Sequence, residues 1–215
     1  PLRKNFHVRE FEKKICKKFN SKHALAVTSG TAAIKIGLKS LGVQKNDEVI
    51  TQAFNFIATI EAILDLGAKP ILAGVDKTLN MCPKLLQKLI TKKTKAIIPV
   101  HMLGVPAKMD EILNISRKFN IPILEDNCEA LGAKYGKKYL GLIGNVGVAS
   151  FDGGKIITCG EGGIILTNNK KIDRYCREYH DHGHENNPRF PRGRDTRKIY
   201  GFNYRMTEIQ GIIGK

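Results

Sequence analysis

The stretch GVASFDGGKIITCGEGG, residues 147–163, decides how the rest of the chain is interpreted. An apolar β-type run at 146–151 leads into a glycine-rich turn that carries one lysine, Lys155, and a second apolar strand follows at 164–167. A lysine held on a short turn at a strand end is partly removed from water, and such lysines serve as nucleophilic amines. The glycines allow a flat ligand to approach the backbone closely. A surface lysine in a flexible loop is the alternative, and the rest of the chain must decide between the two.

Short apolar runs alternate with amphipathic segments on both sides of this stretch. The expected strands are 24–27, 48–51, 70–75, 96–100, 121–124, 146–151 and 164–167. The expected helices are 6–19, 32–41, 56–66, 83–90, 109–119 and 206–213. Short strands separated by helices of about three turns predict an α/β fold, with a mostly parallel sheet covered by helices on both faces.

The chain is basic, with 36 Lys and Arg against 20 Asp and Glu and a net charge of +16. The lysines are spread over nearly every expected helix, and only 7% of the residues are aromatic. Single-stranded nucleic acid needs a basic groove interleaved with stacking aromatics, which this pattern lacks. We therefore expect no nucleic-acid partner; nucleic-acid binding remains the lesser alternative, and an anionic small molecule fits the charge as well.

The cysteines and the hydropathy pattern indicate a cytoplasmic protein without membrane contact. None of the five cysteines forms a CxxC pair, so neither a disulfide framework nor a zinc ribbon is expected. No apolar run reaches membrane-spanning length, and no signal peptide is visible. The chain starts at Pro1 and stops inside the helical pattern 206–213, so we interpret it as a fragment of a longer protein.

Polar residues follow two of the expected strands. Ser29, Gly30 and Thr31 lie between a strand and a helix start, where free N–H groups and the helix dipole bind phosphate; an ordinary N-cap is the alternative. Asp126 stands at the carboxyl end of a buried strand, where α/β sheets place ligands. A protonated pyridine nitrogen would suit this carboxylate, and a helix-capping role is the alternative.

Three further groups each have a functional and a structural interpretation. In Phe54-Asn55-Phe56 one ring could lie against a flat cofactor, or both could pack in the core. The other two groups are the histidines of a possible metal site (His180, His182 and His184, with Cys176) and the arginines of a possible carboxylate site (Arg189, Arg192, Arg194 and Arg197). No ligand set completes the metal site, so we expect hydrogen-bonded histidines and no metal. A solvated basic loop is the alternative for the arginines.

Taken together, these are the parts of a pyridoxal phosphate (PLP) site: a phosphate cup, a ring-stacking aromatic, an Asp for the pyridine nitrogen and a Schiff-base lysine. The chain resembles the DegT/StrS-type sugar aminotransferases, which have the aspartate aminotransferase (type I) fold. The resemblance runs over essentially the whole chain through the following segments: FEKKICKKF, SGTAAIKIGLKSLGV, NDEVITQAFNFIAT, TKAIIPVHMLG, ILEDNCEALGA, SFDGGKIITCGEGG and GFNYRMTEIQ.

The resemblance implies roles for individual residues. Lys155 would bind the cofactor covalently and then shuttle the substrate proton, and Asp126 would keep the ring nitrogen protonated. Phe56 would stack on the ring, whereas the phosphate would be bound by Gly30, Thr31 and Ser150. Glu129 stands where the family often has His or Gln near the ring hydroxyl, so a carboxylate there must be protonated or otherwise paired.

The resemblance also implies an assembly and a domain organisation. Asn203 lies in the segment that reaches the cofactor phosphate of the partner subunit in this family, which implies a homodimer with shared active sites. Residues 1–215 would be the large PLP-binding domain, and the small C-terminal domain of the family would be missing. Some relatives carry histidine in place of the Schiff-base lysine and perform dehydration; because Lys155 is present, aminotransfer is expected.

The segment HDHGHENNPRFPRGRDTRKIYGFNYRMTE, residues 180–208, suggests a substrate. It resembles family members that aminate C8 of an oxidised octulosonate, 3,8-dideoxy-8-oxo-manno-octulosonate, for lipopolysaccharide biosynthesis with L-glutamate as the donor. Arg192 and Arg194 would bind the sugar carboxylate. The alternatives are a nucleotide-linked keto sugar as substrate, a non-enzymatic PLP-binding regulator, and a nicotinamide-dependent enzyme. The last is disfavoured because no GxGxxG follows the first strand.

Overall fold

A computed structural model describes residues 7–187, 189 and 194–215. In this part of the chain, seven strands lie side by side in two hydrogen-bonded sets, which isolated bridges from Ile97 to Ile123 and from Val100 to Asp126 join. The order is β3 (Lys69–Ala73), β2 (Glu48–Gln52), β4 (Thr94–Ile98), β5 (Leu124–Asp126), β8 (Val146–Ser150), β9 (Gly163–Thr167) and β1 (His23–Val27). Among these seven strands the hydrogen-bonded pairs are parallel except those of β9, which is antiparallel to both neighbours. The expected mostly parallel α/β sheet is confirmed.

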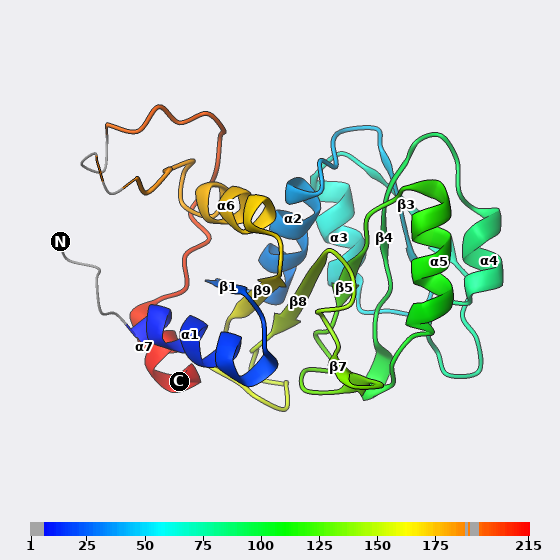
Figure 1. Cartoon of the computed structure of the whole chain (residues 1–215), viewed down its shortest axis with the longest axis horizontal. Coiled ribbons are helices and arrows are strands. Elements are labelled where there is room, and N and C mark those ends of the chain that lie inside the picture. Colours follow the sequence, from blue (N-terminus) through cyan, green and yellow to red (C-terminus); the bar gives the residue numbers. More distant parts are fainter. Residues whose placement is uncertain (1–6, 188, 190–193) are drawn as a thin grey trace.

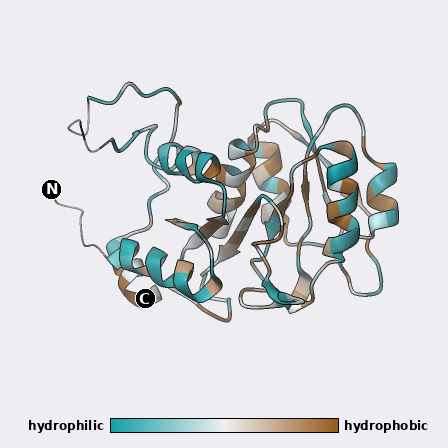
Figure 2. Ribbon diagram, in the orientation of Figure 1, coloured by the Kyte–Doolittle hydropathy of each residue, from teal (hydrophilic) through white to brown (hydrophobic). Residues whose placement is uncertain are grey.

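Helices cover both faces of this sheet (Figure 1). One face carries α2 (Gly30–Ser40), α3 (Ile57–Asp65) and α6 (Lys170–Tyr179), and the other carries α1 (His7–Phe19), α4 (Pro83–Lys88) and α5 (Met109–Phe119). The short α7 (Glu208–Gly214) lies beside α1 at the lower left of the view. Along β1, Leu25 and Val27 join the first core while Ala24 and Ala26 join the second, as the two-residue strand period requires. The apolar strands and the inward sides of the helices are brown in Figure 2.

Most expected elements match the observed ones within two residues, and α5 has the expected bounds. The strand expected at 121–124 is displaced toward its carboxyl end and becomes β5. Asn120 ends α5 in a left-handed conformation, Ile123 makes only an isolated bridge to Ile97 of β4, and continuous pairing with β8 begins at Leu124. The sequence analysis missed α6, although Asn169 caps it and its apolar residues recur at helical spacing. It also missed the hairpin of β6 (Lys134–Tyr135) and β7 (Lys138–Tyr139) and the short helix η1 (Met102–Gly104).

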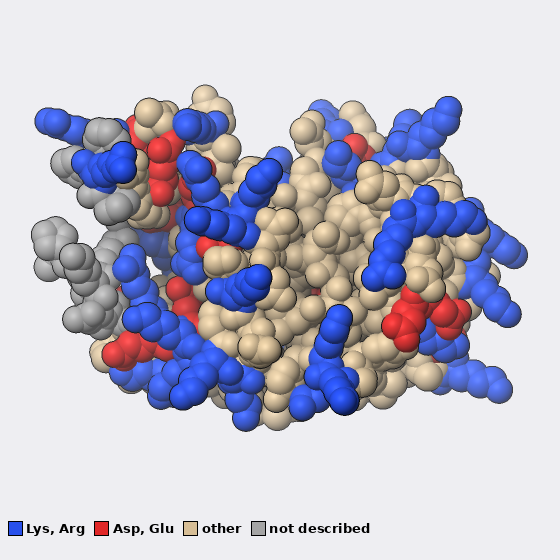
Figure 3. Space-filling view, viewed as in Figure 1, with Lys and Arg blue, Asp and Glu red and all other residues tan. Residues whose placement is uncertain are grey.

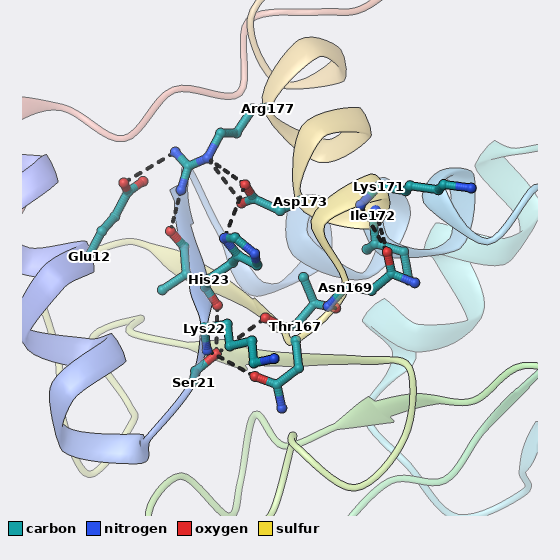
Figure 4. A network of polar contacts seen from close by, with 12 residues as sticks. Glu12, Ser21, Lys22, His23, Thr167, Asn169, Lys171, Ile172, Asp173 and Arg177 are labelled. Atoms are coloured by element: carbon teal, nitrogen blue, oxygen red, sulfur yellow. Dashed lines mark hydrogen bonds and ion pairs between the residues drawn. The ribbon is translucent and has the colours of Figure 1, made fainter.

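Side chains form hydrogen bonds with the free backbone groups at the open edge of β1 (Figure 4). Ala26 donates its N–H to the buried Glu12 carboxylate at 2.9 Å, and the Ala24 carbonyl accepts from Arg177 at 2.8 Å. Arg177 also pairs with Glu12 at 3.3 Å and with Asp173 at 3.0 Å. An edge strand exposes such unpaired backbone groups, and here a partly buried ion pair between α1 and α6 occupies them.

The surface agrees with the composition. Lys and Arg are scattered around most of the face in Figure 3 and do not gather into one stripe. All five cysteines are free thiols. Among the helices that the structure describes, none has the length and apolarity to cross a bilayer.

Candidate active site

One pocket forms where the carboxyl ends of β1, β2, β4, β5 and β8 meet, as expected for ligand sites in α/β sheets. The hollow has a volume of about 160 Å³ and opens to solvent. It is lined by Ser29, Gly30, Thr31, Ile34, Phe56, Ala58, Thr59, Val100, Asp126, Cys128, Glu129, Ser150, Asp152, Lys155 and Glu161. The structure therefore brings together Lys155, Asp126, Phe56, Gly30, Thr31, Ser150 and Glu129, all of which the sequence singled out.

The turn that follows β1 is shaped to receive an anion. Ser29 caps α2 by accepting the Ala32 N–H at 3.1 Å, so the N-cap interpretation holds for its hydroxyl. The first N–H groups of α2 still lack intrahelical partners and point toward the pocket end of the helix. A Cβ on Gly30 would lie 2.9 Å from the Ser150 Cβ, and a Cβ on Gly163 would lie 2.2 Å from the Ser29 carbonyl oxygen. Only glycine allows this turn to lie so close to β8 and β9.

Lys155 is presented on the turn after β8. Asp152 organises this turn by accepting the Gly154 N–H on its carboxylate at 2.6 Å and the Lys155 N–H on its carbonyl at 3.1 Å. The Lys155 amine lies 5.8 Å from the centre of the Phe56 ring, which is 64% exposed. The ring thus faces the pocket and not the core, and the stacking interpretation of Phe56 is geometrically possible. The surface-loop interpretation of Lys155 does not fit its half-buried position beside the pocket.

Asp126 is a buried carboxylate at the end of β5, only 3% exposed. Its Oδ2 accepts from the Thr59 hydroxyl at 2.8 Å and its Oδ1 accepts from the Cys128 N–H at 3.1 Å. Among the described residues no Lys or Arg forms an ion pair with it. Burial and the neighbouring Asp126 charge raise the pKa of the Cys128 thiol well above its ordinary value, so this thiol is neutral at pH 7. The sequence analysis missed Thr59, and only its position in the first turn of α3 could have drawn attention to it.

Glu129 is paired, as the sequence analysis required of a carboxylate at this position. Its Oε2 accepts the Leu103 N–H at 3.2 Å. Leu103 adopts the left-handed conformation (φ 51°, ψ 32°) inside η1 and is 71% exposed. Glu129 therefore holds an uncommon backbone conformation next to the pocket.

A second buried carboxylate, Glu125, was also missed. Its carboxylate accepts the N–H groups of Gly141, Ile143 and Gly144 at 2.6 to 2.9 Å. His101 Nδ1 accepts the Ala107 N–H at 3.1 Å, which places the imidazole proton on Nε2, 3.1 Å from Glu125. Through these bonds the His101–Glu125 pair holds the loop at residues 141–144, before β8, and neither residue lines the pocket.

The remaining candidates lie elsewhere. Asn203 is exposed and lines a separate hollow together with His180, Asp181 and Arg205. Arg194 is exposed, and Arg192 lies outside the described residues. In the described part of the chain no three His, Cys, Asp or Glu side chains gather as metal ligands would. Instead, His180 Nδ1 lies 2.6 Å from the Arg177 carbonyl and His184 Nδ1 lies 2.6 Å from Asp195, so the expected hydrogen-bonded histidines are found at these two positions.

The solved structures that match this architecture define its class, the type I fold of PLP-dependent aminotransferases. An aminotransferase from Psychrobacter cryohalolentis matches with a TM-score of 0.91 and 35% identity, over 97% of this chain and 54% of that one. A GDP-4-keto-6-deoxymannose-3-dehydratase with a trapped PLP-glutamate geminal diamine matches with a TM-score of 0.89 and 30% identity, over 98% of this chain and 59% of that one.

The chain belongs to the DegT/DnrJ/EryC1/StrS aminotransferase family, whose sequence model matches residues 2–215. The GDP-perosamine synthase of Caulobacter vibrioides is 41% identical to it over 208 residues, which make up 95% of this chain and 54% of the synthase. The chain thus spans about half the length of the curated relatives it matches. These relatives support the family resemblance, but they are GDP-perosamine synthases and therefore concern a GDP-linked sugar and not an octulosonate.

Proposed function

We propose that the chain forms the cofactor-binding part of a PLP-dependent aminotransferase that acts on a nucleotide-linked keto sugar. One observation carries the proposal: Lys155, the buried Asp126 carboxylate, the exposed Phe56 ring and the turn at residues 29–31 all line one pocket. These four groups follow the ends of strands that are far apart in the sequence. Their convergence on one pocket supports a PLP site.

The donor set fits PLP. The glycine-shaped turn at the start of α2 offers N–H groups to a phosphate, and the hydroxyls of Thr31 and Ser150 lie at the same end of the pocket. The buried Asp126 has two oxygens that each already accept one bond and retain further lone pairs, which suits a protonated ring nitrogen. Phe56 offers a flat apolar face at the pocket mouth.

When bound, PLP acts as an electron sink for charge on the substrate carbon. The residues of this chain supply the remainder of the chemistry. The Lys155 amine would hold the cofactor covalently and would take and return the proton of the amine-bearing substrate carbon. Asp126 would keep the ring nitrogen protonated, and the Phe56 face would orient the ring. Because Lys155 occupies the position where dehydrating relatives carry histidine, aminotransfer is the proposed outcome.

Two sugars compete as the amino acceptor. The 41% identity to a GDP-perosamine synthase favours a nucleotide-linked keto sugar, with L-glutamate as the proposed donor. The free octulosonate, which segment 180–208 suggested first, becomes the second candidate, with Arg194 and Arg192 as its carboxylate ligands. With a nucleotide sugar as substrate, we expect a cytoplasmic enzyme whose amino sugar enters lipopolysaccharide biosynthesis.

Absorbance spectroscopy tests the reaction class. The purified protein should show the visible band of lysine-bound PLP, and L-glutamate should convert it to the band of the amine form. Lys155→Ala should lack the lysine-bound band. A protein without any cofactor band after PLP addition would refute the proposal, and would favour a site for another anion.

The two acceptors are separated by adding each sugar to the amine form. GDP-4-keto-6-deoxymannose should restore the original band, while 3,8-dideoxy-8-oxo-manno-octulosonate should not. The opposite result would reverse the order of the two substrates. In that case alanine at both Arg192 and Arg194 should raise KM for the octulosonate, and an unchanged KM would remove the role proposed for these arginines.

A further inference from the structure

The hydroxyl of Thr59 reaches across from one element to another. Thr59 lies in the first turn of α3, directly after the loop that carries Phe56. Its Oγ1 donates to Asp126 Oδ2 at 2.8 Å, and the two residues are only 1% and 3% exposed. A buried threonine in a helix ordinarily bonds to a carbonyl of its own preceding turn. Here the hydroxyl bonds to a carboxylate on β5 instead.

The second oxygen of Asp126 is also held. The Cys128 N–H donates to Oδ1 at 3.1 Å, so each carboxylate oxygen of Asp126 accepts one hydrogen bond from another residue of the chain. An ionised carboxylate has about four lone-pair sites, and these two bonds leave the others for the pocket. The torsion that rotates an aspartate carboxylate has broad minima, so external donors must fix the plane of the group.

We propose that Thr59 is a positioning residue that locks the plane of the Asp126 carboxylate, so that an unshared lone pair faces the ring nitrogen of the cofactor. This inference rests on the proposed function. Without the Thr59 hydroxyl, Cys128 alone holds the carboxylate and the group can turn. Its hold on the ring proton weakens for that reason, although no charge and no cofactor ligand is removed.

A purely structural role must be distinguished from this one, since the same bond also ties α3 to β5. Thr51 offers a matched control. It is fully buried on β2, its hydroxyl donates to the Ile98 carbonyl at 3.0 Å, and it accepts a longer bond of 3.4 Å from Asn55 Nδ2. Thr51→Val therefore removes a buried hydroxyl and a tether of similar kind without touching Asp126.

The experiment compares Thr59→Val, Thr59→Ser and Thr51→Val with the unchanged protein. The dissociation constant for PLP is measured by equilibrium dialysis. The protonation of the ring nitrogen is read from its ¹⁵N chemical shift in protein loaded with ¹⁵N-labelled PLP, across a pH series. A hydrogen bond to a charged group is worth enough to weaken binding about tenfold in Thr59→Val. We also expect its ring nitrogen to lose the proton at a lower pH.

The serine variant should resemble the unchanged protein, because it keeps the donor. Thr51→Val should bind PLP normally even if it unfolds more easily. Equal PLP affinity and an equal ¹⁵N titration in Thr59→Val and the unchanged protein would overturn the inference. Equal losses in both valine variants would overturn it too, because they would show a structural effect. Failure of the unchanged protein to bind PLP would instead refute the proposed function on which the inference rests.

Discussion

The Lys155 amine lies 5.8 Å from the centre of the Phe56 ring, although the two residues follow β8 and β2, which are separated in the sheet by β4 and β5. The amine and the ring face each other across the pocket mouth. A phenylalanine that is 64% exposed at such a place gains little from folding, so its apolar face is available to a ligand.

Phe56→Leu should therefore weaken PLP binding while leaving stability nearly unchanged. Loss of a stacked aromatic contact of about 1 kcal/mol corresponds to roughly a fivefold rise in the dissociation constant. Fluorescence titration with PLP measures it. Phe54→Leu is the control, because Phe54 is 48% exposed in the same loop and does not line the pocket. Equal effects of the two substitutions would contradict the stacking role.

Arg177→Met should destabilise the protein. Its side chain pairs with the buried Glu12 and saturates the Ala24 carbonyl, so the substitution leaves a buried carboxylate without its cation and a strand edge without its donor. A loss of about 2 kcal/mol in the free energy of unfolding is expected.

Urea denaturation of Arg177→Met and Arg174→Met provides the measurement. Arg174 also forms an ion pair within α6, with Glu178, but its side chain is 63% exposed. Its loss should cost less than about 0.5 kcal/mol. Similar losses in both variants would mean that the β1 edge does not depend on Arg177.

Acid should destabilise the protein through His180. Burial lowers the pKa of His180 from 6.5 to about 4. Between these pH values the unfolded chain binds the proton and the folded chain does not, so this stability is present above pH 6.5 and is lost as the pH falls toward 4. The loss is on the order of 2 kcal/mol.

His180→Asn should flatten that part of the stability curve, since an amide can still donate to the Arg177 carbonyl. Chemical denaturation at several pH values between 7 and 4 gives the slope, with His182→Asn at the neighbouring exposed position as the control. Burial raises the pKa of Glu12, which has the opposite sign, but this contribution is common to all the proteins and cancels in the comparison. A slope unchanged by His180→Asn would refute the prediction.

If the active sites are shared in a homodimer, inactive variants should complement each other. Lys155→Ala and Asn203→Ala affect different hollows of the same chain, so a mixed dimer would contain one site that is intact in both respects. Mixing the two after mild dissociation should restore part of the aminotransferase activity. Lys155→Ala mixed with Ser150→Ala should restore none, because both residues line one pocket. No recovery in the first mixture would place Asn203 outside a shared site.

The periodic apolar pattern was sufficient to predict the α/β sheet, and the bounds of α5 follow from its amphipathic spacing. The offset of β5 could not be predicted, because residues 121–123 are apolar in either arrangement and the register with β8, which begins at Leu124, is set by tertiary pairing. α6 was missed because its residues are mainly polar, and its three buried apolar side chains form a recognisable face only when they pack against β1 and α2.

By itself, the sequence determined the fold class and the family resemblance, and it predicted Lys155, Asp126 and Phe56 as site residues, because glycine turns and strand ends are local features. Only the tertiary structure decided which donors hold these groups. Thr59 reaches Asp126 across 67 positions of the chain, and Leu103 reaches Glu129 across 26. Such contacts depend on the strand order of the sheet and on the docking of α3, and a hydroxyl or a backbone N–H carries no local sign of its distant partner.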